Sequence, residues 1–211
     1  MRILSIDTTA HFGSLALLED GQVVEEILLH APEGFGQILF DQIGRLLARR
    51  NCNIANIDRF AAAAGPGSFT GVRIGLTAVK GLAEATGKSA IAVSNLEALA
   101  ELGTRPLRAV ILDARRGEIY GAVYDAGLNL IRPEIVMPFR PWLESLPDGD
   151  LEFITTDFAP FRSYINERPV IEQRSLAGAI GRIAARREPS APASLDANYV
   201  RRSDAELFWK E

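Results

Sequence analysis

Two stretches of the chain repeat one order of elements, and this repeat limits the possible folds more than any other feature. Residues 3–29 predict a strand ending at Asp7, a small loop, a second strand, a turn at Asp20-Gly21 and a third strand. Residues 110–136 predict the same series, with Asp113 closing the first strand. An Asp-Gly pair between apolar runs is typical of a hairpin, because glycine adopts positive φ without strain. We interpret the stretches as copies of one unit; the alternative is two unrelated meanders, since such meanders are common.

Helices and further strands are predicted after the first copy. Apolar periodicity and breakers indicate a helix over residues 34–50, a strand over 59–64, a helix over 69–86, a strand over 89–93 and a short helix over 95–102. Gly87 and Gly103 follow the last two helices, where glycine commonly ends a helix in the left-handed conformation.

The second half is shorter, with a strand predicted over residues 152–155 and a helix over 175–187. A breaker at 188–192 precedes a tail, residues 195–211, that we expect to pack back onto the body. These elements predict an α/β protein of two duplicated lobes, each a mixed sheet flanked by helices. The expected division is an N-terminal lobe of residues 1–104 and a smaller C-terminal lobe of residues 105–211. Acidic residues at both first-strand ends resemble the actin/Hsp70 (ribonuclease H-like) superfamily, in which nucleotide binds between the lobes.

Composition restricts the possible partners and compartments. The net charge is −4, whereas a protein that binds nucleic acid without a partner usually carries a surplus of basic residues. Cys52 is the single cysteine, which fits a reducing cytosol and excludes an internal disulfide. The first residues reach Asp7 too early for a signal peptide, and no apolar run approaches a membrane span. We therefore expect a cytoplasmic protein with no membrane partner, which meets RNA only indirectly or through a local patch.

A glycine-rich segment, GPGSFTG at residues 65–71, lies where a strand meets a helix. Free N–H groups at a helix start can hold an anion, so Gly65, Gly67 and Ser68 are candidates for a phosphate-binding or substrate-binding loop. The alternative, which the spacing slightly favours, is a tight turn that lets the helix approach the sheet. The segment is not a P-loop, because the Gly-Lys-Ser/Thr ending is absent.

Asp7 and Thr8 are the other candidates for nucleotide binding. At the end of a strand, they could hold a metal-bound phosphate, as in actin-like folds. The alternative is a polar turn in which a side chain caps backbone groups. Asp113 allows the same two interpretations. No glycine-rich adenosine pocket follows either position, and we expect no cofactor.

The helix over residues 69–86 has one narrow polar stripe and is otherwise apolar or small. A helix of this kind is normally buried, so it lies between two layers of its own lobe or has one side free for a partner. Plain core packing is the strong alternative. The partner-interface hypothesis takes residues from this helix and from the helix over 34–50: Phe35, Ile38, Leu39, Gly71, Val72, Gly75, Leu76 and Val79.

Catalytic chemistry is sparse in this chain. His11 and His30 are the only histidines, and they stand apart from each other and from cysteine in the sequence. We therefore expect no zinc or iron site built on them. No Ser-His-Asp arrangement can be identified either, and we predict no catalytic residue and no metal site.

Four motifs together resemble one family. The segment GPGSFTGVRIG at 65–75, IDT at 6–8, LDARRGEIY at 112–120 and YVR at 199–201 are similar to the Kae1/TsaD family, and within it to the TsaB (YeaZ-type) branch. The first motif is highly specific and the others moderately so. The resemblance covers almost the whole chain. Phe35-Gly36, Asp41 and Ala197 depart from the usual pattern of that branch, which puts contact details in doubt more than membership.

The resemblance implies a function without catalysis by this chain. TsaD members hold a metal through a His-x-x-x-His pair after the glycine loop, and Asn95 and Leu99 stand at those two places here. An amide and a leucine cannot replace two imidazoles. The resemblance implies a subunit that pairs with a TsaD-type catalytic subunit, with a TsaE-type ATPase joining the complex. The product would be N6-threonylcarbamoyladenosine at position 37 of tRNAs reading codons that start with A.

Two further possibilities follow from the same residues. The isolated chain could form a homodimer through the face that otherwise binds TsaD. The alternative function is a small actin-like nucleotide-binding ATPase or kinase, which a measurement of ATP hydrolysis would distinguish from a binding subunit.

Overall fold

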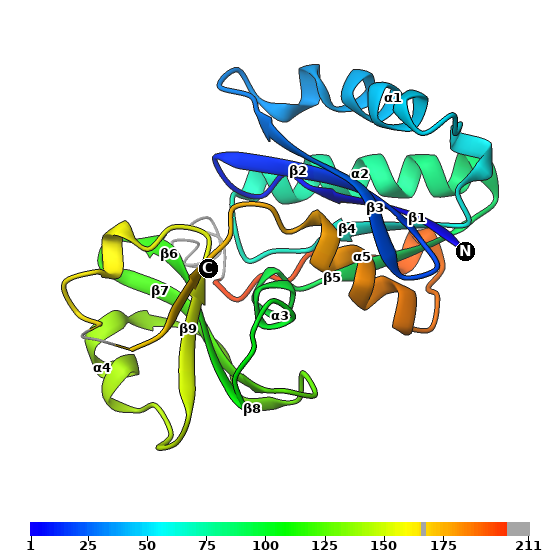
Figure 1. Cartoon of the computed structure of the whole chain (residues 1–211). Helices are drawn as coiled ribbons and strands as arrows, with labels where there is room; N and C mark the ends of the chain where they lie inside the picture. Colours follow the sequence, from blue (N-terminus) through cyan, green and yellow to red (C-terminus); the bar gives the residue numbers. More distant parts are fainter. Residues whose placement is uncertain (166–167, 202–211) are drawn as a thin grey trace, which may run out of the picture.

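The computed structural model describes residues 1–165 and 168–201, which form two five-stranded mixed sheets (Figure 1). The first sheet has the order β3-β2-β1-β4-β5. Its strands are β1 (Arg2–Asp7), β2 (Phe12–Glu19), β3 (Gln22–His30), β4 (Arg59–Ala63) and β5 (Ser89–Val93). The second sheet has the order β10-β9-β6-β7-β8. Its strands are β6 (Leu107–Arg115), β7 (Glu118–Asp125), β8 (Leu130–Pro138), β9 (Leu151–Thr155) and β10 (Val170–Glu172).

The two sheets have one topology. In each, three antiparallel strands are followed by two strands that add in parallel beside the first. The predicted α/β fold of two duplicated lobes is confirmed. It is the actin-like architecture, in which the first strand of each half lies in the middle of its sheet.

The helices differ between the lobes. The longer ones are α1 (Leu39–Arg49), α2 (Phe69–Thr86) and α5 (Ala177–Arg186); α3 (Asn95–Ala100) and α4 (Phe139–Glu144) are short. Single 3-10 turns are η1 (Phe35–Gln37), η2 (Ile54–Asn56), η3 (Ala159–Phe161) and η4 (Pro192–Ser194). The helix predicted over residues 34–50 is thus two pieces, η1 and α1, which meet at Ile38.

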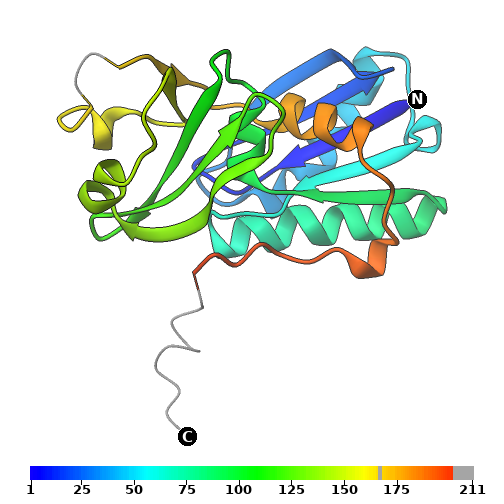
Figure 2. The same cartoon turned by 90° about the horizontal axis from the view of Figure 1, so that it is seen from below.

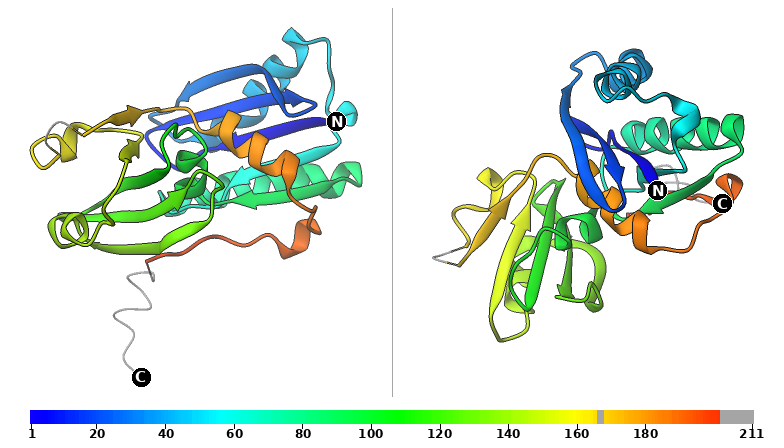
Figure 3. Two further views of the ribbon diagram at one scale, coloured as in Figure 1. Left: turned by 60° about the horizontal axis from the view of Figure 1, so that its bottom comes forward. Right: turned by 45° about the vertical axis from the view of Figure 1, so that its right-hand side comes forward.

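Alternation along the strands places two cores on opposite faces of the first sheet. Leu4 and Ile6 pack with α1 and α2, whereas Ile3 packs with α5. The core around α5 continues into the second sheet through Val110 and Ile154. Figure 3 shows α5 between the two sheets. A third core, around Phe139 and Trp142 of α4, covers the outer face of the second sheet.

Helix α5 follows residue 105 in the chain yet packs on strands β1, β2 and β4 of the first sheet. The chain therefore returns to its first lobe after completing the second sheet. The division into residues 1–104 and 105–211 stays a prediction. Among the helices of residues 1–165 and 168–201, none has the length and apolar character of a membrane span.

Two local predictions are wrong at the level of single residues. Asp113 does not close its strand, because β6 continues to Arg115 and turns through Arg116 and Gly117, whose φ angles are 57° and 78°. These positive values allow a tight hairpin. Helix α3 ends at Ala100, and Gly103 is not left-handed. A Cβ on Gly103 would lie 2.5 Å from Cδ of Arg108, so this glycine leaves room for that side chain.

The tail packs onto the body over its described part, residues 195–201, as predicted. Leu195 is buried in the first lobe, and the Asn198 N–H donates to the Ala64 carbonyl at 2.8 Å. The Asn198 side chain donates to Glu134 of β8 at 2.5 Å, and Arg201 donates to the Ala114 carbonyl at 3.1 Å. Figure 2 shows this segment running along α2 toward the second lobe. The prediction for 202–211 lies outside the described residues.

Candidate functional sites: the interlobe cleft and the helix groove

The glycine segment joins β4 to α2, and several of its backbone groups are bonded within the fold. The Gly65 N–H donates to Oδ1 of Asn95 at 3.1 Å, and the Ser68 N–H donates to the Thr9 carbonyl at 2.7 Å. Ser68 caps α2, because its Oγ accepts from the Gly71 N–H at 3.3 Å. The amides of Gly65, Ser68 and Gly71 are therefore used internally, which favours the interpretation as a turn.

The glycines also permit close packing of α2 on the end of β1. A Cβ on Gly71 would lie 2.0 Å from the Thr8 carbonyl oxygen, and one on Gly67 would lie 2.7 Å from that of Thr9. A Cβ on Gly75 would lie 2.8 Å from Oγ1 of Thr8. Any larger residue at these positions would displace the helix. The three glycines therefore determine how closely α2 approaches the sheet.

Asp7 is buried at the end of β1. Its Oδ1 accepts from the Thr9 N–H at 2.9 Å and from the Thr9 hydroxyl at 2.6 Å. Its Oδ2 has no hydrogen-bond partner among the described residues. Burial raises the pKa of the Asp7 carboxyl, and the bonds from Thr9 oppose that shift. Thr8 is buried as well and donates to the Gly71 carbonyl at 2.7 Å.

Asp113 makes the same local turn in the second lobe, but its side chain is more exposed than that of Asp7. The Arg115 N–H donates to Oδ1 of Asp113 at 2.7 Å, as the Thr9 N–H does to Asp7. The Asp113 side chain is one-third exposed and pairs with the Arg115 guanidinium at 3.2 Å. The repeated turn fits the capping interpretation of both aspartates.

Asn95 and Leu99 are both buried, although Asn95 also borders the cleft between the lobes. Asn95 is 2% exposed, and its N–H donates to the Gly65 carbonyl at 2.8 Å. Its Nδ2 donates to the Thr9 hydroxyl at 2.5 Å. Leu99 is fully buried. These residues stabilise the junction between α3, the glycine segment and β1, and supply no imidazole.

A cleft of about 630 Å³ lies between the lobes. Its wall includes Gly67 and Ser68 of the predicted set, together with Asn95; Asp7, Thr8 and Gly65 are not among its lining residues. The other charged or polar side chains that line it are Thr9, His11, Asp113, Arg115, Tyr120, Thr155, Thr156, Asp157 and Arg174. The mixed charges show no concentration of cations of the kind that grips a nucleotide polyphosphate.

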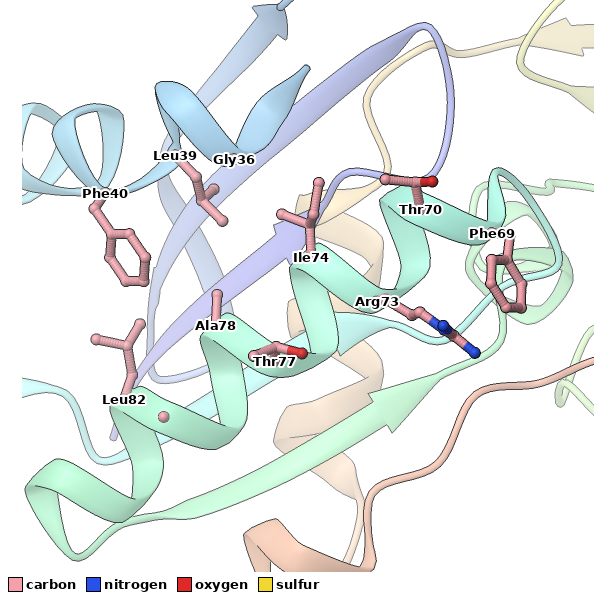
Figure 4. Close-up of a pocket in the computed structure, with 11 residues that line it drawn as sticks. Gly36, Leu39, Phe40, Phe69, Thr70, Arg73, Ile74, Thr77, Ala78 and Leu82 are labelled. Carbon is pink, nitrogen blue, oxygen red and sulfur yellow. The ribbon is translucent and has the colours of Figure 1, made fainter.

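A second concavity, a groove of about 820 Å³, runs between η1, α1 and α2 (Figure 4). In Figure 4, Phe40 of α1 and Leu82 of α2 point toward each other at one end, and Phe69 and Arg73 lie at the other. Phe40 is 60% exposed and Phe69 is 46% exposed. The full wall consists of Gly36, Leu39, Phe40, Phe69, Thr70, Arg73, Ile74, Thr77, Ala78, Gly81 and Leu82.

The residues predicted for a partner interface lie beside this groove, mostly beneath its surface. Phe35, Leu39, Gly71, Val72, Gly75, Leu76 and Val79 are buried, and Ile38 is half-buried. Leu39 alone among them lines the groove. Both helices were identified from the sequence, but their exposed apolar residues were not. Apolar periodicity does not show which side of a helix is covered by the sheet of its own lobe. The available sequence signal was the adjacent apolar pair Leu39-Phe40, because successive residues of a helix point in different directions and one of the two faces away from the core.

A cation–aromatic stack closes one end of the groove. The Arg73 guanidinium lies 3.8 Å from the Phe69 ring centroid. The Tyr199 ring stacks on Phe69 at 5.6 Å, and its hydroxyl accepts from Nε of Arg73 at 3.4 Å. The C-terminal segment thus borders the groove, a contact that the sequence analysis did not anticipate.

The two histidines lie together, contrary to their separation in the sequence. Nε2 of His11 is 3.1 Å from Nε2 of His30. Pairing of Phe12 with His30 across β2 and β3 brings them together. Sequence separation could not reveal this contact, because strand register determines it.

The two sheets of one topology and the glycine junction define a protein of the actin-like fold class. The family model for TsaD, tRNA N6-adenosine threonylcarbamoyltransferase, matches residues 30–140, and the chain belongs to this family. The tRNA threonylcarbamoyladenosine biosynthesis protein TsaB of Bacillus subtilis (strain 168) is 29% identical, over 100% of this chain and 99% of its own. TsaB of Escherichia coli (strain K12) is 36% identical over 64% of each chain.

A solved structure agrees with these relatives. YeaZ from Pseudomonas aeruginosa superposes with a TM-score of 0.80 at 26% identity, covering 94% of this chain and 99% of that one. The resemblance to the TsaB (YeaZ-type) branch that the four motifs indicated is confirmed.

Proposed function

We propose that this chain is a non-catalytic, cytoplasmic subunit of the enzyme that forms N6-threonylcarbamoyladenosine at position 37 of tRNAs reading codons that start with A. It binds a TsaD-type catalytic subunit through the groove between α1 and α2. A TsaE-type ATPase joins the complex, and tRNA is reached through these partners. The names of the similar TsaB proteins and the match to the TsaD family support the biosynthetic role.

The observation that carries the docking part of this proposal is the apolar groove. Phe40 and Phe69 expose large aromatic surface beside Ile74 and Leu82, within one contiguous wall. A contiguous exposed apolar patch on a folded protein often marks a protein interface. Arg73 at its edge adds a charged, stacked side chain of the kind that is enriched at interfaces.

The contacts of Asn95 support the non-catalytic part. Both ends of its amide and its backbone N–H bond to Gly65 or Thr9. Leu99, one helical turn later, packs in the core. No group of three or more His, Cys, Asp or Glu residues suited to a metal ion occurs within residues 1–165 and 168–201. A docked subunit of this kind can still activate its partner by holding the competent conformation.

Without a TsaD-type partner, the groove can pair with that of a second copy. A twofold dimer uses one self-complementary patch on both subunits. The homodimer and the complex with TsaD would then exclude each other, because both cover α1 and α2.

The second candidate function is a small actin-like ATPase or kinase, which the cleft between the lobes favours. Against it stand the internal bonds of the Gly65 and Ser68 amides and the buried position of Asp7. Hydrolysis of ATP by the purified chain, abolished by an Arg115 or Arg174 substitution in the cleft, would support this second function instead.

Reconstitution tests the proposal. The chain is combined with the TsaD-type and TsaE-type proteins of the same cell, tRNA and threonylcarbamoyl-AMP. We expect modified tRNA from the complete mixture and none from this chain alone. Modification by this chain alone, or unchanged modification when it is left out, would contradict the proposed role.

A further inference from the structure

His11 and His30 lie side by side at the surface of the first lobe, with their Nε2 atoms 3.1 Å apart and their rings inclined at 63°. His30 ends β3, and His11 precedes β2, whose Phe12 pairs with His30 in the ladder. The ring centroids are 4.8 Å apart, and both side chains are exposed. Backbone pairing of two neighbouring strands therefore places the two side chains next to each other, before any ligand is bound.

The Phe12 ring restricts both imidazoles. Its centroid lies 4.9 Å from that of His11, edge-on, and 5.1 Å from that of His30. Each imidazole thus has an aromatic neighbour as well as the other histidine. Ligand groups already held in position lose less conformational entropy when they bind an ion.

We propose that His11 and His30 form a two-histidine binding site for a divalent late transition-metal ion, of the class of Ni²⁺, Cu²⁺ or Zn²⁺. Imidazole nitrogens suit these ions. Metal–nitrogen bonds of about 2.0–2.1 Å place two neighbouring ligands on one ion roughly 3.0–3.4 Å apart. The two Nε2 atoms are 3.1 Å apart.

Water completes the coordination. No third His, Cys, Asp or Glu joins the pair among the described residues, so the ion is exchangeable and held more weakly than in a four-ligand structural site. Without the ion, the same distance is that of a hydrogen bond in which one ring donates and the other accepts. Metal binding replaces that bond.

The position gives the site a role. His11 and Phe12 line the interlobe cleft, as does Thr9. An ion held by His11 and His30 would fasten the β1–β2 loop, which forms part of the cleft wall, to the end of β3. Arg174 also belongs to this cluster, with its guanidinium 5.1 Å from the Phe12 centroid. Its positive charge opposes a bound cation.

Calorimetric titration of the tag-free protein with NiCl₂, ZnCl₂ and CuCl₂ at pH 7.5 tests the site. We expect one equivalent of at least one ion to bind. His11→Gln and His30→Gln should each weaken that binding at least about tenfold, because one ligand is lost. Arg174→Gln should bind as well as wild type or more tightly, and Cys52→Ser should bind as wild type does.

Thermal unfolding gives a second measurement. The same ion should raise the Tm of wild type, since it binds the folded arrangement of the pair, and should raise that of His30→Gln much less. Both histidines are exposed, so these substitutions leave the fold intact. No binding of any of the three ions, or equal binding by His30→Gln, would mean that the pair is a hydrogen bond only.

Discussion

Asn95 donates a hydrogen bond to the hydroxyl of Thr9, with 2.5 Å between Nδ2 and Oγ1. The Thr9 hydroxyl in turn donates to Oδ1 of Asp7 at 2.6 Å. Asn95 and Thr9, which are 86 positions apart in the chain, are thereby linked with Asp7 in one buried hydrogen-bond network. The network lies where β1, the glycine segment and α3 meet. An amide at position 95 can both donate to Thr9 and accept from the Gly65 N–H, which a leucine or alanine cannot do.

Asn95→Ala should lower the free energy of unfolding by about 2–4 kcal/mol. The substitution leaves the Gly65 N–H without its acceptor in a buried place, and an unsatisfied buried group costs about 1–3 kcal/mol before the lost packing is added. Urea unfolding followed by circular dichroism measures the change. Asn129→Ala, in the exposed turn with Asp125, is the control and should cost less than about 1 kcal/mol. Equal losses for both would show that the buried amide has no special role.

Two glycines on α2 should respond to alanine in opposite directions. Gly71→Ala puts a Cβ 2.0 Å from the Thr8 carbonyl oxygen, so the helix must move, at a cost of roughly 3 kcal/mol. Gly81 has nothing within 4 Å of an added Cβ, and alanine there should stabilise the helix by about 0.5–1 kcal/mol. Chemical denaturation of both variants measures the difference. A stable Gly71→Ala protein would contradict the close approach of α2 to β1.

Gly75 belongs to the same packing. Its Cβ would lie 2.8 Å from Oγ1 of Thr8, so Gly75→Leu disturbs the interior of the lobe. Such a variant tests folding before it tests a partner surface. Substitutions at the exposed wall of the groove separate the two effects.

Asp7→Asn should make the protein more stable at neutral pH, by roughly 1–3 kcal/mol, because a buried carboxylate whose Oδ2 has no partner among the described residues is replaced by a neutral amide. The pKa of Asp7 is raised by burial, so the folded state binds its proton more tightly than the unfolded state does. Wild-type stability therefore falls as pH rises from the ordinary aspartate range through the raised pKa, and the advantage of the variant grows over that interval.

Unfolding of wild type and Asp7→Asn from pH 3 to pH 8 measures this dependence. Asp113→Asn is the matched control, because it keeps the same turn with the Arg115 N–H while its carboxylate reaches solvent. We expect a smaller effect there. An advantage of Asp7→Asn that is constant with pH would contradict ionisation of a buried carboxyl as its cause.

Phe40→Glu should weaken binding to a TsaD-type subunit at least about tenfold, because it puts a charge into the apolar wall of the groove. Phe40 is 60% exposed, so the variant should fold. Leu130→Glu replaces an apolar side chain of similar exposure, 55%, on β8 of the other lobe. Surface plasmon resonance on both variants compares them. Equal affinities for the two would place the interface elsewhere.

Much of the fold follows from local sequence. The alternating apolar strands, the Asp20-Gly21 turn and the glycine after α2 each depend on residues that are close together in the sequence. Each was predicted near its observed place. The three-residue strand β10 was not predicted, because it is short and gains its stability from pairing with β9. The break between η1 and α1 was missed because apolar spacing continues across it.

The candidate sites were predictable as segments but not as surfaces. Residues 65–71 were identified as a key junction, and the structure uses their glycines for packing against Thr8 and Thr9. The helices that border the groove were identified too. Phe69 and Arg73 are neighbours on one face of α2, whereas Tyr199 reaches them only through the path of the tail.

The sequence alone determined the repeated unit, the order of its elements and the presence of an amide and a leucine at positions 95 and 99, because these depend on residue identity and on short-range backbone preference. The tertiary structure decided which apolar faces are covered, where α5 returns to the first sheet, and that His11 meets His30. Burial and contact depend on segments far apart in the chain. Their positions are set by sheet register and core packing, which act only when the whole chain is folded.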